Sequence, residues 1–190
     1  MKRGTSKKGF TVIEVSLVLA IAGLIFLMVL IALPPLQRSQ RDTARRESVM
    51  DLISQIKKYQ NANRGMLPNG VGTLSVNNGF ASGNAEVKEW VEFYNKYLGA
   101  SFIDVDGSDY NPIIIKCATN ISNKIESGQT CINDELTEGN ESYKLDKLNY
   151  NLMIVLQSMC EGEKAIGTSN PRNLSVLLKL EGSGIYCSNT

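Results

Sequence analysis

A run of uncharged, mostly apolar residues extends from Val15 to Gln37, close to the N-terminus. As an α-helix it would be about 34 Å long, which is enough to cross a hydrocarbon core of about 30 Å. A secretory signal has a shorter apolar stretch, and its cleavage site of small residues follows that stretch. Here the run ends with Pro34, Pro35 and Leu36, and no Ala-x-Ala site follows. We therefore expect the run to be retained as a membrane anchor.

Residues 1–9 form a short basic leader ahead of this run. The leader has no acidic residue, and its four basic residues are Lys2, Arg3, Lys7 and Lys8. This positive flank predicts that the N-terminus stays in the cytoplasm and that the bulk of the chain lies outside. A second basic cluster follows the run and opposes that orientation; it comprises Arg38, Arg41, Arg45 and Arg46. Four cysteines beyond the run favour an extracytoplasmic location of the C-terminal part independently.

Residues 38–64 predict an amphipathic continuation of the same helix. Apolar residues recur there at spacings of three and four and form one stripe, which comprises Val49, Leu52, Ile53, Ile56 and Tyr59. Charged side chains, Arg45 among them, occupy the remaining positions. Gly65 is suited to end the helix, and Pro68 prevents it from resuming. We expect a helix over residues 10–64, with 10–37 in the membrane and 38–64 against a head domain.

Residues 65–190 are expected to form that head domain. The stretch 65–84 is rich in Gly and Asn and predicts an irregular loop. Apolar residues at helical spacing predict a helix over 86–98, with Asn84 as its N-cap. Short strand-like runs separated by turn signals follow at 101–105, 113–117, 152–159, 174–180 and 185–187. The expected fold class is α+β, with a long N-terminal helix packed on a small C-terminal antiparallel sheet.

The four cysteines all lie in the C-terminal part of the chain, and they are Cys117, Cys131, Cys160 and Cys187. Their spacings fit neither a zinc knuckle nor a CxxC redox motif. An even number beyond a membrane segment indicates two disulfides formed in an oxidising compartment. Of the three possible connectivities we favour Cys117–Cys131 with Cys160–Cys187, because each loop is short enough to close locally. Four buried free thiols are the alternative.

The chain contains no histidine. Its absence excludes Ser-His-Asp and Cys-His catalysis, together with the commonest zinc and iron sites. We therefore expect no enzymatic activity, no cofactor and no metal. A formal net charge of +1 does not indicate nucleic acid as a partner. Residues 104–109 contain the acids of a calcium loop, but the position of Gly107 does not fit an EF-hand and favours an Asp-Gly turn between strands.

The segment Gly9-Phe10-Thr11-Val12-Ile13-Glu14 resembles the processing motif of type IV pilins. The resemblance is strong over residues 1–64, and beyond them only the expected architecture is similar. It implies that a prepilin peptidase cuts after Gly9 and that the new amine of Phe10 is N-methylated. It further implies a homopolymer of this chain, built by a pilus assembly machinery into an extracellular filament for adhesion or twitching motility.

Glu14 is the one carboxylate at the start of the apolar segment. A charge at mid-bilayer costs roughly 2.5–3.5 kcal/mol on insertion scales, and less near the end of the span. The resemblance implies that Glu14 pairs with the positively charged N-terminus of Phe10 on a neighbouring subunit and so fixes the register between helices. An unpaired glutamate at the membrane interface is the alternative. The arginines after the run are expected to form a solvated surface that pairs with neighbouring subunits, with anionic lipid or DNA as the alternative.

Pro34 and Pro35 lack the N–H groups that would bond to the carbonyls of Leu30 and Ile31, which predicts a kink or local break. The resemblance implies a locally melted segment in the filament, with Gly23 at its start. The family's usual proline falls about one turn earlier than here, so the length of that segment stays open. A simple helix breaker at the membrane edge is the alternative.

These expectations place the protein in a cell-surface filament, with a pool of single-pass precursor in the cytoplasmic membrane. Within the same family, the alternative is a minor pilin or a pseudopilin of a type II secretion or DNA-uptake system. From a different class, the alternative is a single-span anchored extracellular binding domain that does not polymerise.

Overall fold

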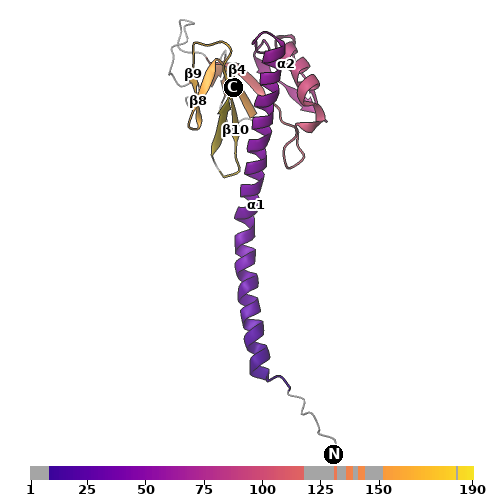
Figure 1. The fold of residues 1–190 in the computed structure, drawn as a ribbon, viewed down its shortest axis with the longest axis vertical. Helices are drawn as coiled ribbons and strands as arrows, with labels where there is room; N and C mark the ends of the chain where they lie inside the picture. The colour runs from indigo at the N-terminus through magenta and orange to yellow at the C-terminus, as the bar shows by residue number, and fades with distance from the viewer. Residues whose placement is uncertain (1–8, 118–130, 132–135, 139–140, 144–151, 183) are drawn as a thin grey trace, which may run out of the picture. The chain divides into compact units, whose positions relative to one another are not determined.

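The computed structural model describes residues 9–117, 131, 136–138, 141–143, 152–182 and 184–190 (Figure 1). Residues 1–8 of the expected leader lie outside the described residues, as do several segments of the expected head domain. The chain divides into two compact units, residues 1–40 and residues 41–190. The fold is α+β, with a long N-terminal helix and a mostly antiparallel C-terminal sheet.

Helix α1 extends over 51 residues, from Val12 to Ala62, close to the predicted 10–64. It contains Pro34 and Pro35 and continues through both of them. A break of the helix at these prolines is therefore not observed, and a kink there stays a prediction. Each proline removes a single hydrogen bond from the ladder, and the long apolar helix on either side retains its own bonds. Melting of this segment in a filament stays a prediction.

The C-terminal end of α1 is fixed by a left-handed turn. Arg64 and Gly65 have φ values of +56° and +81°, and the Gly65 amide donates to the Gln60 carbonyl at 2.7 Å. A glycine in this conformation satisfies the last carbonyls of a helix without steric cost. The predicted role of Gly65 in ending the helix is confirmed.

The second half of α1 packs on the sheet through its apolar stripe. Val49, Leu52, Ile53 and Ile56 are buried and share one core with residues of the central strands. Tyr59, the last member of the stripe, is half-buried against the same core. A face of three to four apolar residues per two turns is what a helix needs to cover one side of a sheet.

The main sheet has five strands in the order β1-β4-β7-β10-β11. Their bounds are Gly72–Thr73, Ile113–Lys116, Leu152–Leu156, Leu174–Lys179 and Ile185–Asn189. The pairs β1–β4, β7–β10 and β10–β11 are antiparallel, but β4 and β7 are parallel. The expectation of a wholly antiparallel sheet is corrected at this one pair. A parallel pair needs a long connection rather than a hairpin, and residues 117–151 provide one.

Within the described residues, three two-stranded antiparallel sheets accompany the main sheet: β2–β3 (Ser75–Asn77 and Phe80–Ser82), β5–β6 (Leu136–Glu138 and Glu141–Tyr143) and β8–β9 (Ser158–Glu161 and Lys164–Gly167). The first of them, together with β1, lies in the stretch expected to be an irregular loop. Its Asn78-Gly79 turn has positive φ at both residues, as a tight two-residue hairpin requires.

Two predicted strands differ in the structure. The run 152–159 is split at Gln157, whose φ of +57° ends β7 and begins β8 in a different direction. Residues 101–105 form no strand, and only an isolated bridge joins Ile103 to Asp109. Residues 104–109 form a turn as predicted, although it lies between the two partners of that bridge and not between strands.

The helix predicted over 86–98 is present in three short pieces. A 3₁₀ turn, η1 (Ala85–Val87), leads into α2 (Lys88–Phe93) and then into a π-helical turn, η2 (Tyr94–Leu98); a separate 3₁₀ turn, η3 (Gly99–Ser101), follows. Asn84 occupies the N-cap position, but its side chain makes no capping hydrogen bond, so the predicted capping role is corrected. Trp90, Phe93 and Tyr94 are buried and anchor this segment in the core.

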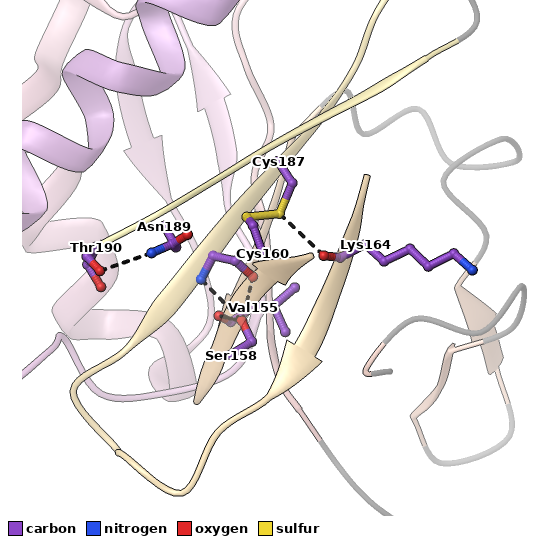
Figure 2. Close-up of a disulfide and its surroundings, with 8 residues drawn as sticks. Val155, Ser158, Cys160, Lys164, Cys187, Asn189 and Thr190 are labelled. Carbon is purple, nitrogen blue, oxygen red and sulfur yellow. Dashed lines mark hydrogen bonds between the residues drawn. A yellow bond between two sulfur atoms is a disulfide. The ribbon is translucent and has the colours of Figure 1, made fainter. Parts of the chain in front are cut away.

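Both disulfides of the favoured connectivity are present, with Cα–Cα distances of 5.0 Å for Cys117–Cys131 and 5.8 Å for Cys160–Cys187. Figure 2 shows that the second one links hairpin β8–β9 to the edge strand β11. Closing loops of 14 and 27 residues removes unfolded-state entropy worth roughly 3 kcal/mol for each bond. The two disulfides therefore stabilise the half of the domain that is farthest along the chain from α1.

Candidate functional site

The N-terminal half of α1 is apolar on every side and has no covering protein. No residue from Phe10 to Gln40 is buried, and each of the consecutive side chains Leu24–Ile31 is at least 48% exposed. Successive residues of an α-helix are about 100° apart, so this stretch presents apolar groups around the whole circumference. A helix of this kind belongs in lipid or among other apolar helices. By length and composition alone, α1 is the one described helix that could cross a membrane.

Glu14 has local partners that the sequence reasoning did not foresee. Thr11 is the residue before α1, and its hydroxyl accepts the Glu14 amide N–H at 3.2 Å. In return, one Glu14 carboxylate oxygen accepts the Thr11 amide N–H and the Thr11 hydroxyl, both at 3.3 Å. This reciprocal arrangement is a capping box, which satisfies two of the free N–H groups at a helix start. The sequence signal was present, since Thr11-Val12-Ile13-Glu14 fits the capping pattern.

The expected cleavage point lies just ahead of this cap. Gly9 and Phe10 are outside the helix and exposed, and Phe10 is 86% exposed. Nothing lies within 4 Å of the position that a Cβ on Gly9 would take. The structure thus presents the Gly9–Phe10 peptide bond as an open segment, one helical turn before Glu14. Gly23 lies inside α1 and has open space around it.

The arginines that follow the apolar run are not one solvated surface, and that prediction is corrected for Arg45. Arg45 is buried and donates to Asp104 through Nε at 2.8 Å and through Nη2 at 2.9 Å. Its Nη1 donates to Glu181 at 2.9 Å. Arg41 forms an outer pair with the same Glu181, with a shortest distance of 2.7 Å. These four residues are called the arginine clamp below.

The carboxylate of Asp104 has further partners that complete its hydrogen bonding. It accepts the Tyr110 hydroxyl at 3.1 Å and the Val105 amide at 2.7 Å. A buried carboxylate needs this many donors to offset its lost hydration. Burial raises the pKa of the Tyr110 phenol, so this hydroxyl remains a donor at physiological pH.

The pKa shifts in the clamp follow from its hydrogen bonds. The bond to Asp104 raises the pKa of Arg45, so the guanidinium is charged at physiological pH. The bond from Arg41 lowers the pKa of Glu181 below its ordinary value. The hydrogen bonds of the clamp tie α1 to the 104–109 turn and to the turn after β10.

Sequence reasoning missed the clamp because its partners lie 59 and 136 residues from Arg45. One signal was available: Arg45 precedes Val49 by four residues and so continues the buried stripe. An arginine on a buried face requires an acidic partner, but the sequence does not specify which one. Within the described part of the chain, no three His, Cys, Asp or Glu side chains cluster as metal ligands would.

The fold and the site together define an architecture: a long apolar N-terminal helix with a capped carboxylate, followed by a disulfide-linked sheet domain. This architecture is pilin-like. No protein-family model, no curated protein and no solved structure matches the chain, so architecture and local motifs carry the functional argument.

Proposed function

We propose that this protein is a filament subunit of the type IV pilin kind, which polymerises through the apolar half of α1. One observation carries the proposal: the apolar side chains of this helix half are exposed on all sides. A single carboxylate, that of Glu14, lies near the start of this apolar surface. Before assembly, lipid covers the helix and anchors the subunit in the cytoplasmic membrane. After assembly, the same helices of neighbouring subunits cover one another in the filament core.

Apolarity alone does not account for assembly. Lipid tails are as apolar as a neighbouring helix, so moving α1 from lipid to the filament core gains little hydrophobic free energy. Close packing and polar pairing must supply the preference. Glu14 is the charged residue in the apolar half of this helix and can supply a specific polar contact, and the amine of Phe10 on a neighbouring subunit is its proposed partner.

The capping box refines this role of Glu14. A carboxylate has about four lone-pair sites, and the intrachain bonds to Thr11 occupy one oxygen only. The other oxygen is available for the amine of a neighbour while the cap is kept. The cap also holds the carboxylate at the start of the helix. This fixes the position along the helix axis at which the amine of the neighbouring subunit must lie.

The location of the head domain supports the same proposal. Two disulfides suit an oxidising space outside the cytoplasm, so the sheet domain is assigned to the outer side of the membrane and the leader to the cytoplasmic side. Prepilin peptidase would act on the Gly9–Phe10 bond, and a pilus assembly machinery would extract the processed subunit. No catalytic role is proposed for this chain.

Processing is tested by the N-terminal sequence and intact mass of the mature protein. We expect a chain that begins at Phe10, carries one added methyl group and retains the whole of α1. Replacing Gly9 by Val should block processing and leave the leader attached, because a branched side chain hinders access to the peptide bond. A mature wild-type protein that begins at Met1 would contradict the proposal.

A further inference from the structure

A groove of about 1080 Å³ opens on the side of the sheet domain that carries the end of α1. Its walls come from four places: the last turn of α1, the segment 66–71, helix α2 and the ends of β4 and β7. All of them belong to the unit formed by residues 41–190. This volume lies slightly above the usual range of ligand-binding pockets, about 300–1,000 Å³. Neither the capped start of α1 nor the arginine clamp contributes to it.

The groove runs along an open part of a sheet edge. Strand β1 pairs with β4 only at Gly72–Ile114 and Thr73–Ile113, and Leu74 donates to the Pro112 carbonyl. On β4, Cys117 donates to Leu156 of β7, so the backbone groups of residue 116 point the other way, toward the β1 edge. The Lys116 N–H and C=O have no hydrogen-bond partner on that edge among the described residues.

The departure of β1 from β4 is built into the backbone. Continuing the register would place Gly70 opposite Lys116, but Gly70 has a φ of +108° and turns away. A Cβ on Gly70 would lie 1.7 Å from the Glu86 carbonyl oxygen, so only glycine allows this close packing on η1. The edge at Lys116 is therefore held open by the fold.

Gln157 also lines the groove. Its side-chain oxygen is buried and has no hydrogen-bond partner among the described residues. The backbone of Gln157 is held in place, because its N–H donates to the Asn173 carbonyl and its carbonyl accepts the Thr168 backbone N–H. A buried amide oxygen without a partner is costly, so rotation of this side chain toward a donor in the groove would be favourable.

Another part of the lining is acidic and aromatic. Glu89 and Glu92 of α2 line the groove together with Tyr59, and the Glu89 carboxylate also accepts the Asn69 backbone N–H. Burial raises the pKa of the Tyr59 phenol, with the two carboxylates adding to the effect, which agrees with their proximity. A free backbone edge, an acceptor without a partner and two carboxylates in one groove are the elements of a peptide-binding groove.

We propose that this groove binds an extended peptide segment with a basic side chain, which adds to β4 as a short strand opposite Lys116 and directs its charge toward Glu89 and Glu92. The peptide backbone would exchange hydrogen bonds with the N–H and C=O of Lys116. A peptide N–H or side-chain donor would satisfy the Gln157 oxygen. Selectivity would come from the α2 wall, since the acidic pair favours lysine or arginine there over glutamate.

The test uses the full chain in detergent micelles and the fluorescein-labelled hexapeptide Thr-Val-Lys-Val-Thr-Val, with binding followed by fluorescence polarisation. Lys116→Pro removes the lysine side chain and, among the backbone groups, only the N–H that faces the open edge, so the bonds to β7 stay in place. Lys116→Ala is the matched control, because it removes the side chain and keeps the backbone donor. We expect saturable binding that weakens about tenfold in K116P and changes less than about threefold in K116A. Thermal melts followed by the fluorescence of Trp90 establish that both variants are folded.

Two further experiments distinguish strand addition from nonspecific hydrophobic or electrostatic binding. A peptide with N-methyl groups on the amides of one edge should lose binding, and a peptide with Glu in place of Lys should bind more weakly to wild type. Glu92→Lys should reverse the preference between the two peptides by about threefold in each direction. Absence of saturable binding, equal binding by folded K116P and K116A, or full binding of the N-methylated peptide would each overturn the proposal.

Discussion

Replacing Glu14 by Gln is expected to abolish surface filaments while leaving processed subunit in the membrane. Glutamine serves as well as glutamate in a capping box, so the start of α1 is preserved. What the substitution removes is the negative charge proposed to face the amine of Phe10 on a neighbour. Removing one partner of a buried ion pair costs about 3–5 kcal/mol, which at each contact corresponds to a loss of a hundredfold or more. The measurement is electron microscopy of sheared filaments beside an immunoblot of the membrane fraction.

The matched control is Ser16→Ala, which lies within the same turn of α1. Ser16 is uncharged, and its hydroxyl donates to the Ile13 carbonyl of its own helix. Its removal should leave filaments and membrane levels unchanged. Normal filaments in E14Q would contradict a role for the charge, and would assign Glu14 to helix capping alone.

Replacing Arg45 by Met is expected to destabilise the sheet domain by about 3–5 kcal/mol. The side chain of Asp104 is 1% exposed, and without Arg45 its carboxylate keeps, among the described residues, the Tyr110 hydroxyl and the Val105 backbone N–H as donors. A buried charge without its counter-ion is among the most destabilising defects in a protein interior. Urea unfolding of the full chain in detergent, followed by Trp90, measures the change. Trp90 is the single tryptophan and is fully buried.

Arg41→Met is the control for this substitution. Arg41 also pairs with Glu181, but its side chain is 42% exposed, and exposed pairs contribute about 0–1 kcal/mol. The double variant Arg45→Met with Asp104→Leu should recover much of the lost stability, because an apolar pair removes the uncompensated charge. An R45M variant no less stable than R41M, or a double variant no better than R45M, would contradict the account of the clamp.

The parts of the structure that local sequence determines were predictable. The apolar composition and the three-to-four-residue spacing of apolar side chains predict the extent of α1. The position of Gly65 predicts where the helix ends. The four main strands β4, β7, β10 and β11 follow from short β-branched runs bounded by turn signals. The disulfide connectivity was favoured by loop length. Each of these features depends on residues within a few positions of one another, or on a simple closure entropy.

The parts that depend on distant contacts were not predictable. The parallel pairing of β4 with β7 and the ion pair of Arg45 with Asp104 both bring together residues separated by many intervening positions. Gln157 splits a continuous strand-like run by adopting a positive φ that its residue type does not signal. Pro34 and Pro35 do not break α1, because a long apolar helix tolerates the loss of two backbone hydrogen bonds. At the candidate site, Gly9, Phe10 and Glu14 were proposed from the motif. The cap formed by Thr11 and Glu14 is local and fits a known capping pattern, but it was not predicted.

The proposed role as a pilus subunit is tested by mass spectrometry and imaging of filaments sheared from the cell surface. We expect filaments in which this chain, starting at Phe10, is a structural subunit, and whose core in a cryo-electron microscopy map consists of residues 12–36 with Glu14 next to the N-terminus of a neighbour. Dominance of the chain in the preparation indicates a major pilin, and trace amounts indicate a minor one. A processed or unprocessed chain found only in the membrane fraction, with filaments that lack it, would show that the protein is not a filament subunit.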